Sequence, residues 1–346
     1  MLRFALSIAL ATGCLAVSAN ACGFHNFAPQ PTLVDRLLAS DQIVLARPAQ
    51  SNPFRFDVIE VLEGSSVAVE LPHLVDSNTR RQLAKKTSAA VLFAREAEMG
   101  TWNRLVLVDK TTNPIVRKVM GDLEHWRSGE TTSRFSYFAQ LVNHPDARVH
   151  QLALRELDQA DYSALRLLNV DVPAERLLIP LEDMTGYMLR PIRVLLLGQS
   201  EMDGLGARLI SGLKSSVIAQ APDLGAFATA YIEYTGAKAV SDITETYLMD
   251  RRLPLLTREM LLEAMSLHAD APDPAVQKAI VSSVETVLWV EPGLAGAVAR
   301  KFGSQGDWTY KTALSAVLDG GGVNAFTDRQ DVLAYLSRAE KGAKNP

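Results

Sequence analysis

The sequence HPDARVHQLALREL, residues 144–157, decides the fold of the larger part of the chain. Asp146 follows a proline and stands where a helix N-cap is expected, because its carboxylate can accept hydrogen bonds from the free N–H groups of a first turn. Apolar residues then return every three or four positions, which is the spacing of one face of an amphipathic helix. They are Val149, Leu152, Ala153, Leu154 and Leu157. We therefore expect a helix from Asp146 to Leu157.

The same arrangement returns twice further along the chain. Asp273 follows Ala271-Pro272, Asp307 follows the turn at 303–306, and each precedes apolar residues at helical spacing. Gly204-Leu205-Gly206 lacks the third glycine of a dinucleotide-binding loop and follows no strand, so we interpret it as the turn before a helix. From Gly121 onward the chain is expected to be helical. The spacing predicts further helices over residues 133–142, 163–168, 191–197, 206–213, 225–234 and 258–268.

Residues 144–149, HPDARV, resemble the start of the second helix of HEAT-type repeats, in which an Asp opens a helix that packs on its neighbour. Arg148 precedes the valine here, whereas the arginine of such repeats often follows it. The resemblance implies an all-α solenoid over residues 120–346, with a long concave surface suited to holding a protein partner. The alternative is an irregular helical domain without true repeats, because the three matching helices are unequally spaced.

Residues 22–119 have a different period. Phe54, Phe56 and Val58 alternate with Arg55 and Asp57, as they do in a half-buried strand. Several short strands predict a small barrel or curled sheet, because closure removes exposed strand edges. The sequence also predicts a polar helix over 77–86. The other expected strands are 43–45, 67–71, 90–93, 102–108 and one that starts at 115–116.

Two stretches, SDQIVLA at 40–46 and FRFDVIEVLEG at 54–64, resemble the opening of netrin-like modules. The resemblance implies an OB-type β-barrel that begins just after an N-terminal cysteine, although the cysteines that staple the eukaryotic modules are missing. In the metalloprotease inhibitors of that family the N-terminal cysteine chelates the target's zinc, and this role would fall on Cys22. The expected fold is therefore α+β and multidomain. A β-barrel-like domain covers 22–119, and a HEAT-like helical domain covers 120–346.

The first 21 residues have the order of a secretory signal peptide. Met1-Leu2-Arg3 is a short basic start, residues 4–17 are apolar, and the small residues Ala19 and Ala21 form the A-x-A pattern that precedes cleavage. Cleavage is expected before Cys22, with export to the periplasm or beyond. Lipidation of Cys22, which would tether the chain to a membrane, is the alternative. With Cys14 removed in the signal, one cysteine remains and no intramolecular disulfide can form.

Cys22-Gly23-Phe24-His25 is the one group of residues that suggests metal chemistry. A thiolate, a free α-amino group and an imidazole three residues on are ligands for copper or zinc. Only Cys22 and His25 contribute side chains, so anchoring of the terminus is the plainer interpretation. The sequence contains no H-E-x-x-H, C-x-x-C, P-loop or G-x-S-x-G motif. We expect no catalytic residues and no cofactor, with a hydrolase of unrecognised site as a further alternative.

Composition limits the class of partner. Removal of the signal takes away Arg3 and leaves 34 Lys and Arg against 39 Asp and Glu, a net charge of −5. A mildly acidic chain without a basic block is poorly suited to nucleic acid. After the signal no apolar run is long enough to span a bilayer. The sequence therefore predicts a non-enzymatic binding or scaffold protein of the bacterial cell envelope that engages a protein partner.

Overall fold

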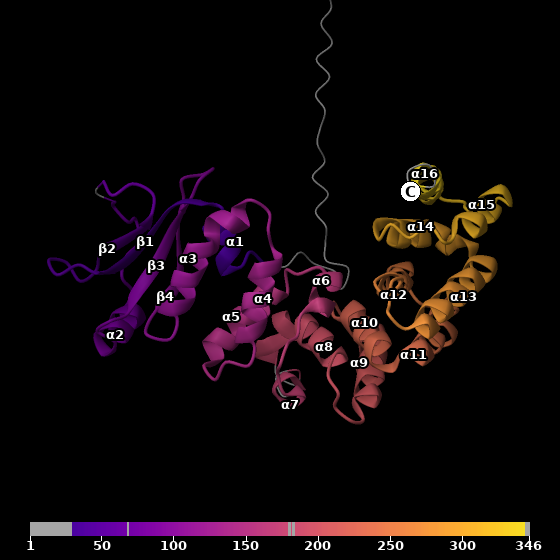
Figure 1. The fold of residues 1–346 in the computed structure, drawn as a ribbon, viewed down its shortest axis with the longest axis horizontal. Helices are drawn as coiled ribbons and strands as arrows, with labels where there is room; N and C mark the ends of the chain where they lie inside the picture. Colours follow the sequence, from indigo (N-terminus) through magenta and orange to yellow (C-terminus); the bar gives the residue numbers. More distant parts are fainter. Residues whose placement is uncertain (1–29, 68, 179–180, 182–183, 343–346) are drawn as a thin grey trace, which may run out of the picture.

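The computed structural model describes residues 30–67, 69–178, 181 and 184–342 of the chain. This part is an α+β structure, in which a small antiparallel sheet is followed mostly by helices (Figure 1). The strands are β1 (Ser40–Pro48), β2 (Phe56–Glu63), β3 (Ala90–Glu96) and β4 (Trp102–Val108).

Two α-helices lie before β3 in the chain and fourteen follow β4 within the described residues. The first nine helices are α1 (Leu33–Leu38), α2 (Ser77–Lys85), α3 (Asn113–Arg127), α4 (Thr132–Leu141), α5 (Ala147–Leu157), α6 (Tyr162–Leu167), α7 (Ala174–Leu178), α8 (Arg190–Gly198) and α9 (Leu205–Ala219). The others are α10 (Leu224–Thr235), α11 (Ala237–Ile243), α12 (Leu255–Ser266), α13 (Pro274–Val290), α14 (Ala295–Ser304), α15 (Lys311–Asp319) and α16 (Phe326–Gly342). Short 3₁₀ or π turns occur at Met184–Leu189, Thr244–Leu248 and Pro292–Leu294.

The central strands are buried on both faces. β1 pairs antiparallel with β3, and Val44 lies opposite Phe93. Alternate residues of β3 point to opposite sides: Leu92 packs towards the helices, whereas Phe93 packs into a second, smaller core. This explains why the sequence of β3 is a continuous apolar run rather than an alternating one. The smaller core consists of Val44, Ala46, Phe56, Leu71, Val75, Leu83, Ala89, Val91 and Phe93.

The sheet is open, in the order β2-β1-β3-β4, so the predicted closure into a barrel is not confirmed. Two of the expected strands were wrong within the described residues. Residues 69–71 have no strand partner, and only Leu71 is buried there, whereas Val67 is 75% exposed. Ile115 and Val116 lie in α3, because Pro114 occupies the first turn of a helix whose buried residues recur at helical spacing.

Two of the three expected Asp caps are confirmed. The backbone N–H of Arg148 donates to Asp146 over 2.9 Å at the start of α5, and the N–H of Ala275 donates to Asp273 over 2.8 Å at the start of α13. The third was wrong: Asp307 accepts the N–H of Thr309, and α15 begins only at Lys311. The turn that Asp307 caps therefore ends before α15 begins, and Asp307 is not the N-cap of α15.

Ion pairs join the sheet to the first helices. Asp109, at the end of β4, is 6% exposed and lies 2.6 Å from Lys86 Nζ and 3.0 Å from Arg148 Nη1. Burial alone would raise the pKa of Asp109, but hydrogen bonds from Lys86 and Arg148 outweigh it and hold that pKa below its ordinary value. Helix α3 crosses the domain boundary expected after residue 119, and one continuous core extends from the sheet into the helices. The division into two domains therefore stays a prediction.

The later helices lie in two rows along a curved path (Figure 1). Helices α8, α10, α12, α14 and α16 contact one another in that order, and α11, α13 and α15 form a second series. In Figure 1 the first series lies on the inside of the curve, and α9, α11, α13 and α15 lie on the outside. Within the first series α8 and α10 pack closely, because a Cβ on Gly198 of α8 would lie 2.8 Å from Ala230 Cα of α10.

Candidate functional site

The site residues predicted from the sequence lie outside the described residues. Ala19 and Ala21 of the expected cleavage site, and Cys22 and His25 of the expected metal site, all precede residue 30. Signal cleavage and metal binding by Cys22 and His25 therefore stay predictions.

The other histidines do not converge. His144 Nδ1 accepts the backbone N–H of Asp146 over 3.0 Å, whereas the buried His150 lies with its Nε2 3.3 Å from Arg193 Nη1. His125 is exposed and faces Glu130. In the part of the chain that the structure describes, no group of three or more His, Cys, Asp and Glu side chains is placed to hold a metal ion.

A buried polar cluster joins three helices. Tyr162 on α6 donates to Glu233 on α10 over 2.8 Å, and His268, just after α12, places Nε2 3.2 Å from both Tyr162 Oη and Glu233 Oε2. Arg166 Nε also lies 3.2 Å from Glu233. Tyr162 and His268 are 2% and 1% exposed. The sequence analysis missed this cluster, because its members are far apart in the chain and follow no spacing rule.

The geometry of the cluster determines which ring nitrogen of His268 carries a proton and which groups donate hydrogen bonds. His268 Nδ1 lies 2.8 Å from the Ala264 carbonyl, which only accepts, so Nδ1 carries a proton. Tyr162 Oη, His268 Nε2 and Glu233 Oε2 lie within hydrogen-bond distance of one another, and the hydroxyl of Tyr162 donates its proton to Glu233. Burial would raise the pKa of Glu233, but hydrogen bonds from His268 and Tyr162 lower it.

This cluster lies at a junction between helices. A general acid or base must come within hydrogen-bond reach of a substrate. Tyr162 and His268 are almost fully covered by protein, and neither they nor Glu233 line the two cavities described next. The charge-assisted hydrogen bond instead ties α6, α10 and the end of α12 together.

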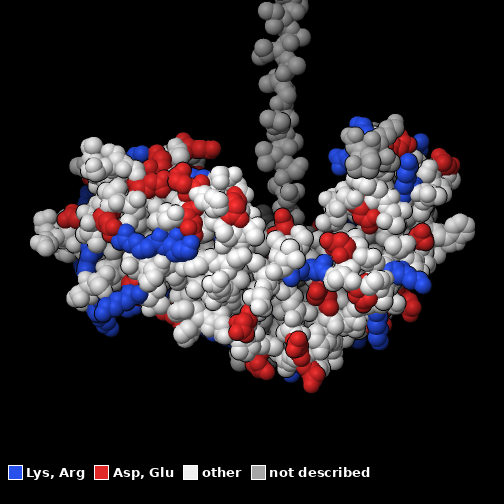
Figure 2. Space-filling view, in the orientation of Figure 1, with Lys and Arg blue, Asp and Glu red and all other residues white. Residues whose placement is uncertain are grey.

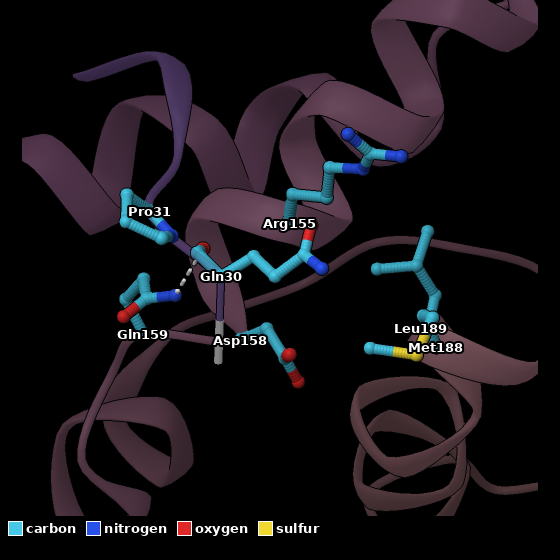
Figure 3. Close-up of a pocket in the computed structure, with 7 residues that line it drawn as sticks. All are labelled: Gln30, Pro31, Arg155, Asp158, Gln159, Met188 and Leu189. Carbon is cyan, nitrogen blue, oxygen red and sulfur yellow. Dashed lines mark hydrogen bonds between the residues drawn. The ribbon is translucent and has the colours of Figure 1, made fainter. Parts of the chain in front are cut away.

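A small cavity of about 90 Å³ lies between the start of the described chain and α5 (Figure 3). Gln159 Nε2 donates to the carbonyl of Gln30 over 3.3 Å, and the guanidinium of Arg155 points away from the carboxylate of Asp158. Ligand pockets usually enclose about 300–1,000 Å³. A cavity of this size, without convergent charged groups, fits a junction between segments better than a ligand site.

A larger groove, of about 350 Å³, lies between α13 and α15 on the outer row, and we call it the α13–α15 groove. Trp289 lines it and is 88% exposed, the highest exposure among the large apolar side chains of the described residues. Val290 beside it is 42% exposed, so the end of α13 presents two adjacent apolar side chains to water. The groove is lined by Glu285, Leu288, Trp289, Pro292, Ala313, Ala316, Val317, Gly320 and Gly322.

The sequence contains a signal for this groove, which is a run of consecutive apolar residues at the end of a helix. Residues 287–290, VLWV, are four consecutive apolar residues at the end of α13. A helix packed on one side can bury only part of such a run, because successive residues lie about 100° apart around the axis. Val287 and Leu288 are buried, whereas Trp289 and Val290 are exposed. A consecutive apolar run within a helix therefore indicates that some of its apolar side chains are exposed.

Charge is unevenly distributed on the face in Figure 2. At the end of the molecule that holds the sheet, a group of acidic side chains lies above a band of basic ones, whereas the two signs are interspersed over the later helices. None of the helices in the described residues is both long and apolar enough to cross a bilayer.

Comparisons with known proteins add no relative. No family model, no curated protein and no solved structure matches the chain.

Proposed function

We propose that this chain is an exported, non-enzymatic binding protein of the bacterial cell envelope, and that its helices form a HEAT-like solenoid that holds a protein partner. The observation that carries the proposal is Trp289, 88% exposed at the α13–α15 groove. Tryptophan is among the residues that contribute most to protein–protein affinity, and an indole exposed to water gains most when a partner covers it. The polar cluster of Tyr162, Glu233 and His268, buried between helices, supports a structural rather than a hydrolytic role.

The two rows of helices support the solenoid part of the proposal. In a solenoid each repeat contacts only its neighbours, so the core extends along one axis and leaves long surfaces free. Contacts from α10 to α12, from α12 to α14 and from α14 to α16 follow this rule, as do those from α11 to α13 and from α13 to α15. The netrin-like interpretation of residues 22–119 has less support. An OB-type barrel has five strands and needs closure, and the described sheet has four and is open.

Covalent capture in the cell envelope tests the binding function. A photoreactive amino acid would replace Trp289 or Val317 in the groove, and Ile218 of α9 or Leu333 of α16 outside it. We expect protein adducts of defined mass at the groove positions. Lys278, exposed on α13 about three helical turns before Trp289, serves as the control and should give none. Absence of adducts at all four test positions would contradict a stable protein partner, whereas adducts only at Ile218 or Leu333 would move the binding surface elsewhere.

Intact mass tests export. The full chain produced in a Gram-negative host is expected in the periplasmic fraction with a mass that begins at Cys22, because the A-x-A pattern at Ala19 and Ala21 directs cleavage there. A variant with Glu at both alanines should keep its full length. Added acyl chains on Cys22, with the protein in the membrane fraction, would replace the soluble form with a tethered one. A full-length wild-type protein in the cytoplasm would contradict export.

A further inference from the structure

The wall of the α13–α15 groove on the α15 side is made of small residues. Ala313, Ala316 and Gly320 line it, and they fall at the spacing of one helix face. On the α13 side stand Leu288, which is buried, and Trp289, which is not. Small residues on one side allow another chain to approach closely, and the indole on the other offers a wide apolar surface. The groove therefore has room for apolar side chains of a partner.

The charge of the groove is negative. Glu285 lines it one helical turn before Trp289, and Asp319 is the last residue of α15, next to the lining residue Gly320. Neither carboxylate forms an ion pair with another described residue. No Lys or Arg lines the groove. The cations that follow Thr244–Leu248 in the chain are paired elsewhere: Arg251 and Arg258 with Glu291, and Arg252 with Asp250.

The end of α15 strengthens this negative potential. α13 ends at Val290, whose carbonyl accepts from Arg251 over 3.2 Å, and α15 ends at Asp319. The segments that follow the two helices meet, since a Cβ on Gly322 would lie 2.8 Å from Pro292 Cβ. A helix C-terminus carries partial negative charge, and an acidic residue such as Asp319 at that position is unfavourable for the helix alone. A cation bound at this end of the groove would relieve that repulsion.

We propose that the α13–α15 groove binds a short apolar segment of a partner protein that carries a Lys or Arg. The apolar side chains lie along Ala316 and Val317, and the cation lies between the carboxylate of Glu285 and the indole face of Trp289, where it gains both ion pairing and a cation–π contact. This inference rests on the proposed binding function and names the chemistry of the partner segment.

Charge also argues against two other occupants. A second copy of the chain in a two-fold contact would place the groove against itself and bring Glu285 and Asp319 of both copies together. A bacterial membrane surface rich in anionic lipid would be repelled by the same carboxylates. A basic, apolar segment is the occupant that complements both the surface and its charge.

The test uses the full mature chain and a random dodecapeptide display library. Peptides are selected on the wild-type protein and counter-selected on Trp289→Ala, which removes an exposed side chain and should fold normally by circular dichroism. We expect the enriched peptides to combine apolar residues with at least one Lys or Arg. Synthetic copies are then titrated by fluorescence anisotropy. We expect Trp289→Ala to weaken binding about tenfold or more, and Ile218→Ala, on α9, to leave it unchanged.

A double-mutant cycle tests the cation. Glu285→Gln is expected to weaken binding about fivefold to tenfold for a peptide with its Lys or Arg, and to have no effect once that residue is replaced by Gln. Thr286→Ala is the matched control on the same helix.

Three results would overturn the proposal: no peptide that depends on Trp289, selected peptides without a basic residue, or a wild-type dimer that Trp289→Ala dissociates in sedimentation. If these occur while photo-adducts form at Ile218 or Leu333, the binding function stands and the groove assignment falls.

Discussion

Replacing Arg134 with Met lowers the free energy of unfolding by an expected 3–5 kcal/mol, roughly the cost of leaving one buried charge without its partner. Arg134 on α4 is 5% exposed and Glu156 on α5 is fully buried, with Arg134 Nη2 lying 2.6 Å from Glu156 Oε2. The same nitrogen lies 2.8 Å from Asp35 on α1. Loss of the guanidinium would leave the Glu156 carboxylate among apolar groups with only neutral donors.

The neutral hydrogen-bond donors to Glu156 show why the pair of Arg134 and Glu156 matters for the fold. Glu156 accepts the hydroxyl of Thr32 over 2.9 Å and the backbone N–H of Val34 over 3.1 Å. Through these bonds one carboxylate anchors the segment before the sheet to a helix more than a hundred residues away in the chain. Arg134→Met should therefore loosen α1 as well as α4, which hydrogen exchange of the α1 amides will detect.

The free energy of unfolding that is lost in Arg134→Met should depend on pH. Burial raises the pKa of Glu156, and the charge of Arg134 opposes that rise. In Arg134→Met the charge that lowered the pKa of Glu156 is lost, so that pKa rises further. A carboxyl whose pKa is raised in the folded state contributes stability below its unfolded pKa and loses it as pH rises through the folded pKa. The loss of stability in Arg134→Met should thus be smaller at acid pH than at neutral pH.

Urea unfolding at both pH values measures these effects. The double variant Arg134→Met/Glu156→Leu is the control, and it should recover much of the loss, because it removes the unpaired charge rather than the packing. An equal loss of stability in the single and double variants would show that the cost comes from packing alone and would contradict the ion-pair account.

Replacing Phe93 with Ala is expected to lower the free energy of unfolding by about 3–5 kcal/mol, the usual cost of removing a large aromatic side chain from a core. Phe93 is fully buried, and its ring packs edge-to-face on Phe56 with centroids 4.9 Å apart. It is the largest fully buried side chain of the smaller core. That core has few other members, so little of the cavity can be filled by its neighbours.

Hydrogen exchange on Phe93→Ala also tests the expected domain division. We expect amides of β1 and β3 to lose protection while those of α10 and α12 keep theirs, because Phe93 faces the smaller core, to which α10 and α12 contribute no residue. Phe93→Leu, which keeps most of the volume, should lose much less stability. Simultaneous loss of protection in the sheet and in the late helices would show that the chain unfolds as one unit, and the boundary after residue 119 would then be wrong.

Local patterns predicted most of the elements correctly. The caps at Asp146 and Asp273, the strand at 102–108 and the polar helix near 77–86 follow from hydrogen-bonding capacity and apolar spacing within a few residues. The failures came where local sequence was compatible with two structures. Ile115 and Val116 are strand-forming residues that α3 absorbed, and residues 67–71 alternate like a strand without a neighbouring strand to pair with.

The candidate sites also divide into features that follow from local sequence and features that depend on tertiary contacts. The sequence by itself determined the class of elements, the change from a period of two to a period near 3.6 at about residue 121, and the signal-like first 21 residues, because each depends on neighbours along the chain. Only the tertiary structure decided that Tyr162, Glu233 and His268 form one hydrogen-bonded cluster, that Arg134 meets Glu156, and that α13 and α15 leave Trp289 over an apolar groove. Those contacts join residues whose separation in sequence carries no period, and they exist because packed helices bring distant side chains into a volume from which water is excluded.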